Sequence, residues 1–456
     1  MARGKKKETM TPEERLQAAL VPESEQPYKV PGNWCWTQLG TYIDFATDYV
    51  ANGSFASLKQ NVAYYKEENY AILVKTQDFS NSFTEDLTYT DKRGYDFLKK
   101  SVLYGGELIL SNIGSIGKVF RVPHLNKPMT LAPNSIMIKC YRETDYDLLY
   151  YYFLSPFGTE QLYSITTGTA VKKFNKTDLK AICLPLPPLS EQQRIVDRIE
   201  SLFSKLDEAK QKAQEALDSF EIRKAAILHK AFTGELTAQW RKEHGVGMES
   251  WEKSRFDEVA TIKSNLVNPL DFPDLPHIAP DNIEKKTGVL LEYHTVSEDG
   301  VTSGKHRFYP GQILYSKIRP YLSKVVVVNF NGLCSADMYP IEAKGNARCL
   351  WYYMLSEEFL EQASSAGSRS VLPKINQKEL SALTVVLPTL KDEQEEIVRI
   401  LDDLFSKEQQ AKEAAEGVLE QIDLIKKAIL ARAFRGELGT NDPTEENAVK
   451  LLCSWD

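Results

Sequence analysis

The chain contains two copies of one long sequence unit, with a period of about 200 residues. The run EQQRIVDRIESLFSK begins at Glu191, and the similar run EQEEIVRILDDLFSK begins at Glu393. The similarity extends to AFTGEL at 231–236 and AFRGEL at 433–438. Solenoid proteins repeat much shorter units, of about 20 to 50 residues. The sequence therefore predicts a tandem duplication of one large unit.

The first part of each copy is rich in short β-type runs and opens at a tryptophan, Trp34 or Trp251. The runs are ELILSNI, KVFRV and NSIMIKC in the first copy, and QILYSKI and KVVVVNF in the second. Gly, Asn and Pro separate them, and helical patterns intervene at 147–154 and 350–362. This mixture predicts an α+β body in each copy.

The second part of each copy has the pattern of one long amphipathic helix. Apolar residues recur at alternating steps of four and three, which is the spacing of a coiled-coil seam. A helix of about 40 residues is about 60 Å long and needs a partner along its apolar face. We expect the two helices to pair with each other, antiparallel because the chain must return. The predicted seam consists of Ile195, Ile199, Leu202, Leu206, Ala209, Ala213, Ala216, Phe220 and Ile227 in the first helix, and Ile397, Leu401, Leu404, Ala411, Ala415, Val418, Ile422, Ile425 and Ile429 in the second.

Sequence signals mark the ends of both helices. Capping boxes are expected at the starts, and glycine stop signals after the ends. The seam also has two polar interruptions, since Glu408 aligns with Leu206 and Arg223 aligns with Ile425. The end signals are Ser190 with Gln193 and Asp392 with Glu395 at the starts, and Gly234 and Gly436 at the ends.

The charge balance leaves nucleic acid open as a partner. The net charge of −7 at first argues against it. The deficit lies in the last segment, 389–456, whereas 30–180 and 251–388 are each close to neutral. Each β-rich body could therefore carry a local basic face.

Motifs for catalysis or metal binding are missing from the sequence. The six cysteines form no CxxC pair, and the histidines show no zinc-ligand spacing, so no metal site is predicted. The stretch Gly114–Lys118 lacks the P-loop spacing, and Val119 replaces the hydroxyl that would hold magnesium. A PD…ExK outline, Pro273 to Lys286, is interrupted by prolines, and we interpret it as a solvated loop.

Targeting and membrane signals are also missing. The basic N-terminus is followed by no apolar segment, and no apolar stretch approaches the roughly 20 residues that span a bilayer. We expect a cytoplasmic protein without a membrane partner. The run Lys5–Lys7 is interpreted as a solvated tail rather than as a DNA-binding arm.

The block LPLPPLSEQQRIVDRIE follows GTAVKKFNK, and a degenerate second copy reads LPTLKDEQEEIVRILDDLF. This text resembles the DNA-sequence-specificity subunit of bacterial type I restriction-modification systems, over nearly the whole chain. The resemblance implies two target-recognition domains, separated by two long helices that form an antiparallel coiled coil with pseudo-twofold symmetry. Each domain would read one half of a split, asymmetric target in double-stranded DNA.

The resemblance also implies partners. The helices would dock two modification subunits, which bind S-adenosylmethionine and methylate adenine N6, and restriction subunits would translocate DNA with ATP and Mg²⁺ and cleave it. This chain would then be no enzyme and bind no cofactor itself. Two other functions remain open on sequence alone: a coiled-coil scaffold that spaces two protein ligands, and a metal-dependent nuclease.

The domain boundaries follow from the repeat. The head and tail of the chain together could mimic the linker between the copies, so we expect the two ends to lie close together. The predicted segments are an N-terminal extension (1–30), target-recognition domain 1 (31–188), a central helical spacer (189–236), a linker (237–250), target-recognition domain 2 (251–389), a C-terminal helical spacer (390–438) and a C-terminal tail (439–456).

Polar loop residues are the candidates for DNA contact, because sequence readout needs donors and acceptors that phosphate contacts hold in place. Arg319 and Arg369 are the preferred candidates for bases, and Lys172 and Lys173 for phosphates. The candidates lie in the loop after each Gly106 or Gly311 strand, in the small-residue loop before each spacer helix, and in a third, looser place that includes Ser135 and Ser335. They are Asn112, Ser115, Lys118, Asn134, Thr167, Thr169, Lys172 and Lys173 in the first copy, and Lys317, Arg319, Lys324, Ser368, Arg369, Ser370 and Lys374 in the second.

Apolar residues outside the seam are the candidates for contact with a modification subunit. They are Val196 and Phe203 on the first helix, and Val398 and Phe405 on the second. The alternative is that these four side chains pack against the globular bodies of their own chain.

Overall fold

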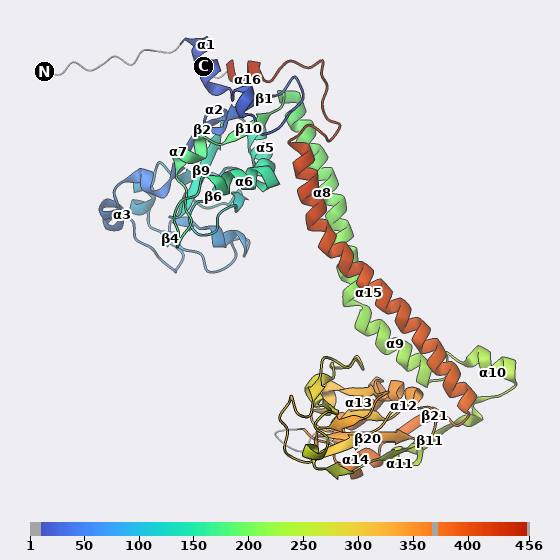
Figure 1. Ribbon diagram of the computed structural model, residues 1–456. Coiled ribbons are helices and arrows are strands. Elements are labelled where there is room, and N and C mark those ends of the chain that lie inside the picture. The colour runs from blue at the N-terminus through green and yellow to red at the C-terminus, as the bar shows by residue number, and fades with distance from the viewer. Residues whose placement is uncertain (1–10, 367–372, 454–456) are drawn as a thin grey trace. The chain divides into compact units, whose positions relative to one another are not determined.

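The computed structural model describes residues 11–366 and 373–453 of the chain (Figure 1). The chain divides into two compact units, Met1–Gln211 with Val418–Asp456, and Lys212–Gly417. Each unit contains one α+β body and portions of the long helices. The predicted fold class is therefore confirmed, and the two units are described separately below.

The body of unit 1 consists of two four-stranded sheets, in the strand orders β2-β9-β6-β7 and β4-β3-β8-β5. The first sheet is antiparallel, whereas β3 and β8 in the second are parallel. The pair β1–β10 closes the body beside the spacer helix. The elements are α1 (Pro12–Ala19), β1 (Cys35–Gln38), α2 (Leu39–Tyr42), β2 (Ile43–Asp48), α3 (Phe55–Asn61), β3 (Ala71–Val74), η3 (Thr76–Phe79), β4 (Tyr89–Thr90), α4 (Lys92–Phe97), β5 (Val102–Leu103), β6 (Leu108–Ser111), β7 (Val119–Arg121), β8 (Met129–Leu131), β9 (Ser135–Cys140), α5 (Glu143–Leu154), α6 (Pro156–Ser164), α7 (Lys176–Lys180) and β10 (Cys183–Leu186).

The body of unit 2 repeats this plan, with a fifth strand, β13, added to its second sheet, whose order is β13-β16-β19-β14-β15. The order β12-β20-β17-β18 corresponds to the first sheet, the parallel pair β14–β19 corresponds to β3–β8, and β11–β21 corresponds to β1–β10. The duplication read in the sequence is thus also a duplication of topology. The elements are α10 (Ala238–His244), β11 (Trp251–Arg255), α11 (Phe256–Val259), β12 (Ala260–Ile262), β13 (Leu266–Val267), β14 (Pro276–Ile278), η6 (Pro280–Asn282), β15 (His294–Thr295), β16 (Lys305–Phe308), β17 (Ile313–Ser316), η7 (Pro320–Leu322), β18 (Val325–Val327), β19 (Gly332–Cys334), β20 (Met338–Ala343), α12 (Ala347–Met354), α13 (Glu357–Ala366), α14 (Gln377–Ser381) and β21 (Thr384–Pro388).

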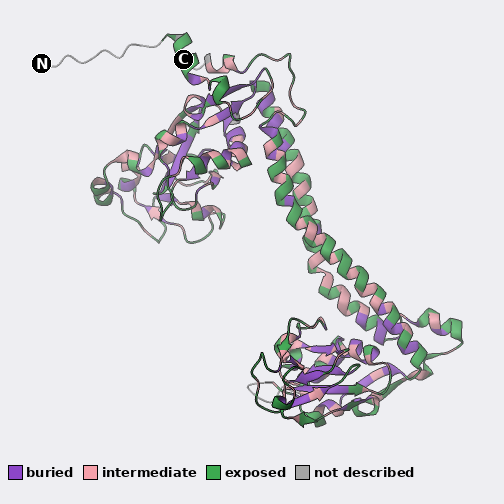
Figure 2. Ribbon diagram, viewed as in Figure 1, coloured by how far each residue is buried: buried purple, intermediate pink, exposed green. Residues whose placement is uncertain are grey.

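The central sheet of each body is buried on both faces, which explains its nearly continuous apolar strands (Figure 2). Successive side chains of a strand point to opposite faces. Leu108 and Leu110 accordingly join the core that includes the helices, whereas Ile109 joins the core between the two sheets. In unit 2, Ile313 and Leu314 separate between two cores in the same way.

Two long helical segments pair antiparallel, as predicted. They are α8 (Leu189–Asp218) with α9 (Phe220–Phe232), and α15 (Lys391–Ala433). In unit 1 the start of α8 and the end of α15 share one core, which contains Ile199 and Leu430, and Asp207 pairs with Lys426 at 2.5 Å.

The pairing in unit 2 runs in the same sense. The core contains Leu401 and Leu228, Glu408 binds Arg223, and Lys412 lies over the ring of Phe220. Residues that come later in α15 therefore contact residues that come earlier in α9, which is the antiparallel order. Of the residues that the structure describes, none belongs to a helix long and apolar enough to cross a membrane.

The predicted long first helix is interrupted at one residue, Ser219, whose backbone stays right-handed helical and whose N–H still donates to the carbonyl of Glu215 at 3.1 Å. The carbonyl of Ala216 accepts from the Ser219 hydroxyl at 3.0 Å and from the Arg223 guanidinium at 3.3 Å, and this guanidinium also donates to the Ser219 hydroxyl. Arg223 also donates to Glu408 at 2.9 Å, and the two polar interruptions of the seam thereby satisfy each other. The aligned position in α15 is Ile425, which has no such donor, and that helix is continuous.

Two other details differ from the prediction. The helices begin at Leu189 and Lys391, so Ser190 lies inside the first turn and donates to Glu445 at 2.6 Å instead of capping the helix. Val418 and Ile425 are each 41% exposed, because the buried side of this part of α15 turns through Ile422. The stop signals are confirmed, since both glycines after the helices have positive φ.

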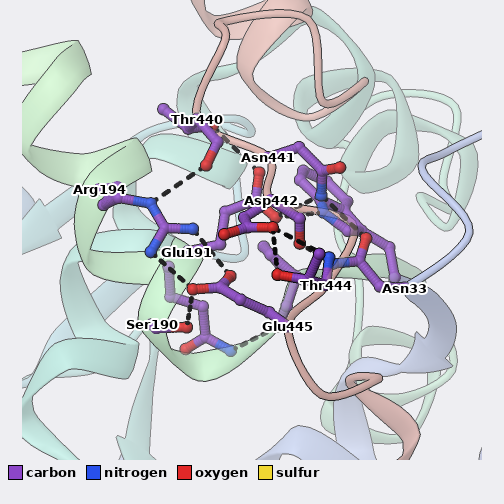
Figure 3. Close-up of polar contacts among 12 residues, drawn as sticks. Asn33, Ser190, Glu191, Arg194, Thr440, Asn441, Asp442, Thr444 and Glu445 are labelled. Atoms are coloured by element: carbon purple, nitrogen blue, oxygen red, sulfur yellow. Dashed lines mark hydrogen bonds and ion pairs between the residues drawn. The ribbon is translucent and has the colours of Figure 1, made fainter.

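A buried glutamate in the first turn joins each long helix to its body. Glu191 accepts hydrogen bonds from the indole of Trp34 at 2.7 Å, from Thr440 at 3.0 Å and from Asn441 at 2.8 Å (Figure 3). In unit 2, Glu393 accepts from the indole of Trp251 at 3.0 Å. Its other donors are Thr237, Arg241 and Ser250.

The two ends of the chain lie side by side in unit 1. Asn33 donates to the carbonyl of Asp442 at 2.9 Å, and the backbone N–H of Ala448 donates to the carbonyl of Asn33 at 2.9 Å. Arg194 binds Glu445 through two hydrogen bonds of 2.8 Å. The tail thus does in unit 1 what the linker 237–250 does in unit 2, as expected from the sequence.

We predict that Glu191→Ala lowers the free energy of unfolding of unit 1 by about 1–3 kcal/mol, because three donors lose their buried acceptor. Chemical denaturation of the purified chain measures this change. Glu420→Ala, which removes an exposed carboxylate from α15 of the same unit, is the matched control. Equal effects of the two substitutions would contradict the role of Glu191.

Candidate nucleic-acid interface

The predicted DNA-contact loops of the first copy meet at one edge of their body. Ile113 and Lys173 form a β-bridge, and Lys173 also bridges Thr167. The N–H of Gly114 donates to the carbonyl of Lys172 at 3.1 Å, and the N–H of Asn112 donates to that of Asn134 at 3.3 Å. Backbone hydrogen bonds therefore hold together three loops that are separate in the sequence.

The second copy places its equivalent loops in the same arrangement. Ile318 bridges Lys374, the Arg319 N–H donates to the carbonyl of Pro373 at 2.7 Å, and the Lys317 N–H donates to that of Asp337 at 3.0 Å. The predictions for Ser368, Arg369 and Ser370 lie outside the described residues. Convergence in both bodies is what a reading surface on a duplicated scaffold requires.

Most first-copy candidates are exposed, which suits contact with a ligand. Asn112 is half-buried and differs, because its side chain donates to the carbonyl of Phe174 at 3.1 Å and so holds the backbone. The candidate Ser135 is buried in β9. The exposed candidates are Ser115, Lys118, Asn134, Thr167, Thr169, Lys172 and Lys173.

The lysines of the second copy are held by their own chain. Lys317 lies 3.7 Å from Asp337, and Lys374 lies 3.0 Å from the same carboxylate. Lys324 donates to the carbonyl of Pro280 at 2.7 Å and lies 3.3 Å from Asp281. Burial lowers the pKa of the Lys317 ammonium below its usual value.

Arg319 is exposed and has a left-handed backbone, with φ of 48°. This region is uncommon for a residue other than glycine. The hydrogen bond to the carbonyl of Pro373 and the following Pro320 hold the backbone in this conformation, so the point at which the Arg319 side chain leaves the backbone is fixed. Held strain of this kind gathers at binding sites.

The first copy also has a cleft that the sequence analysis missed. It has a volume of about 340 Å³ and lies beside the predicted residues Ser115 and Asn134. The missed residues belong to the segment after β3, where the buried run AILV gives way to the polar run KTQD. That abrupt change was the available signal. The lining residues are Tyr64, Leu73, Lys75, Thr76, Gln77, Thr88, Ser111, Ile113, Ser115, Ala132, Pro133 and Asn134.

The four residues proposed for subunit contact pack inside their own units. Val196 and Val398 belong to buried cores, with 4% and 8% exposure. Phe203 packs edge-on against Tyr151, and Phe405 packs against Tyr352, in each case partly buried. These contacts agree with the alternative interpretation of the sequence, in which the four side chains pack the helices against the globular bodies of their own chain. Their contact with a partner stays a prediction.

The nuclease outline gains no support from the arrangement of its residues. Glu284 and Lys286 lie in the turn after η6, outside the strands of the sheet, and not on converging strands. Within residues 11–366 and 373–453, no group of three or more His, Cys, Asp or Glu side chains could hold a metal ion.

The structure is that of a protein with two similar α+β bodies, each carrying an equivalent cluster of surface loops and joined to paired long helices. Known proteins identify the family. The family described as "Type I restriction modification DNA specificity domain" matches residues 50–217 and 248–417. The chain therefore belongs to this family.

Individual relatives agree with the family match. The chain is 40% identical over 292 residues to the type I restriction enzyme EcoDI specificity subunit of Escherichia coli, covering 59% of this chain and 66% of that subunit. It is 23% identical over 412 residues to the EcoKI specificity subunit of Escherichia coli strain K12, covering 83% and 85%. The crystal structure of the HsdS subunit from Thermoanaerobacter tengcongensis has the same fold, with a TM-score of 0.62 at 21% identity, covering 91% and 100%.

We predict that Lys172→Ala with Lys173→Ala weakens DNA binding equally for all sequences. Two lost phosphate contacts lower the slope of log affinity against log salt by about 2. Binding to target and unrelated duplexes over a salt series measures this effect. The control is Lys29→Ala with Lys450→Ala, which removes the same charge from exposed positions near the helical end of unit 1 and should leave the salt dependence unchanged. A loss confined to the target duplex would instead make these two lysines base readers.

Proposed function

We propose that this chain is the sequence-specificity subunit of a type I restriction-modification complex and that it reads a bipartite, asymmetric target in double-stranded DNA. The observation that carries the proposal is the family match to both copies, with equivalent loops gathered at the same edge of each body. A scaffold for two protein ligands would need neither feature.

The side chains at the two edges support two different half-sites. The first edge presents hydroxyl and amide groups with exposed lysines, whereas the second presents Arg319 beside lysines that are paired with carboxylates. Amides suit adenine and arginine suits guanine in the major groove. The two α+β bodies therefore differ in the bases that they can bind.

In this proposal the chemistry belongs to partner subunits. Two modification subunits would bind S-adenosylmethionine and methylate adenine, and restriction subunits would use ATP and Mg²⁺. The chain itself would bind no cofactor and catalyse no reaction. Because its substrate would be chromosomal DNA, we place the complex in the cytoplasm.

Mapping of methylated adenines tests the function. The chain, co-expressed with a modification subunit of the same system, should place N6-methyladenine in one split motif of host DNA. Deletion of the segment that encodes this chain should abolish that motif while the modification subunit is still made. Methylation without a split motif, or magnesium-dependent cleavage by this chain alone, would overturn the proposal.

The helices offer a repeated apolar position for the modification subunits. Ile222 on α9 is 73% exposed, and Leu424, which occupies the equivalent position in the other copy, is 65% exposed. A single exposed apolar side chain is ordinary. Its recurrence in both copies is what two identical partners would require, so we propose that Ile222 and Leu424 take part in this contact.

We predict that Ile222→Asp leaves one modification subunit bound and that Ile222→Asp with Leu424→Asp leaves none, because a buried, unpaired carboxylate is costly. Native mass spectrometry of the co-expressed complex counts the subunits. Leu270→Asp, at a residue that is also 65% exposed but lies on the body of unit 2, should leave the assembly intact. A full complement of subunits in the double variant would place the contact elsewhere.

A further inference from the structure

The cleft of unit 1 forms where three chain segments leave their strands. Because β3 and β8 are parallel, with Val74 beside Leu131, the segments that follow them leave the sheet at the same edge. These segments supply 75–77 and 132–134, and the end of β6 with the loop after it supplies Ser111 and Ser115. The fold thus brings together polar groups from three loops over a buried floor.

The lining can donate and accept hydrogen bonds while carrying little net charge. Gln77 and Asn134 are exposed amides, and Ser115 adds an exposed hydroxyl. The cation of the lining, Lys75, lies 4.0 Å from the buried carboxylate of Asp78. A phosphate site would present unpaired cations, so this lining suits a neutral, planar group with donors and acceptors.

In the second copy, two lysine side chains bind carbonyls of the equivalent segments. Lys317 follows β17 as Asn112 follows β6, and its ammonium donates to the carbonyl of Ala336, after β19. Lys324 precedes β18 as Lys118 precedes β7, and it donates to Pro280, after β14. In the first copy Asn112 is shorter and binds Phe174 instead, and Lys118 is exposed, so the space remains open.

Asn134 presents its side chain from a constrained backbone. Its φ is 71°, a left-handed value that asparagine tolerates better than most residues, and its carbonyl accepts from Asn112. The exposed Lys173 is tied through Ile113 to the same loop cluster. Phosphate contacts at the rim would position the duplex while the amides face base edges.

We infer that this cleft receives the edge of an adenine in the first half-site, and that Gln77 and Asn134 are specificity-determining residues. The carboxamide of either residue can accept from adenine N6 and donate to N7, a pair of contacts that no other base offers in the major groove. The inference rests on the proposed function and adds to it the base and the residues that read it.

Binding of the assembled complex to a duplex set tests the inference. The set carries the split motif found by methylation mapping and replaces each base pair of the first half-site in turn. Gln77→Ala should reduce the preference for adenine at one position about 10- to 100-fold and leave the second half-site unchanged. Asn134→Gly, which keeps the left-handed backbone accessible, should relax the same or the adjacent position.

Gln60→Ala is the matched control, since it removes an exposed glutamine from α3 of the same body and should leave every preference unchanged. Unaltered preferences in the Gln77 and Asn134 variants would overturn the inference, as would equal losses on unrelated duplexes or a change confined to the second half-site. Failure of the unsubstituted complex to show a split motif would instead overturn the proposed function.

Discussion

A buried carboxylate in the first turn of each long helix organises the unit around it. Glu191 and Glu393 both have 0% exposure, and a buried carboxylate is costly unless donors surround it. The donors come from two other parts of the chain, the tryptophan that opens the body and the segment that follows the returning helix. One group therefore fixes three things together: the entry of the body, the start of one helix and the exit of the other. The helix N-terminus adds a favourable dipole for the negative charge.

The same framework carries two different surfaces. Strand order and the parallel pair are repeated, and the edge loops are tied by equivalent backbone bonds at Ile113 and Ile318. Side chains on these loops are free to differ because backbone atoms hold the loops in place. Lysine side chains bind loop carbonyls at one edge, whereas the other edge has a cleft. Backbone atoms thus maintain the shared framework, whereas side chains make the two surfaces different.

The sequence predicted the framework well, because duplication and hydrophobic periodicity report directly on repeated topology and on paired helices. It located the start of each helix less well: Ser190 looked like a cap, yet tertiary contact with Glu445 takes its hydroxyl. It also did not reveal the short interruption at Ser219, where the side chains of Ser219 and Arg223 donate to the carbonyl of Ala216. Among candidate site residues, the convergence of the loops followed from the alignment of the copies. Gln77 and Lys75 were missed because their place beside Asn134 depends on the parallel pairing of β3 with β8, which local patterns do not reveal.

The ion pairs between the long helices bear on how the lengths of these helices can change. Arg223 meets Glu408 in unit 2, and Asp207 meets Lys426 in unit 1, so the helices are matched at two points along the chain. An insertion in the first helix alone, between Asp207 and Arg223, would separate at least one of these pairs. An equal insertion in α15, between Glu408 and Lys426, would bring both pairs back together. Such matched insertions keep the apolar seam in phase when they preserve the heptad period.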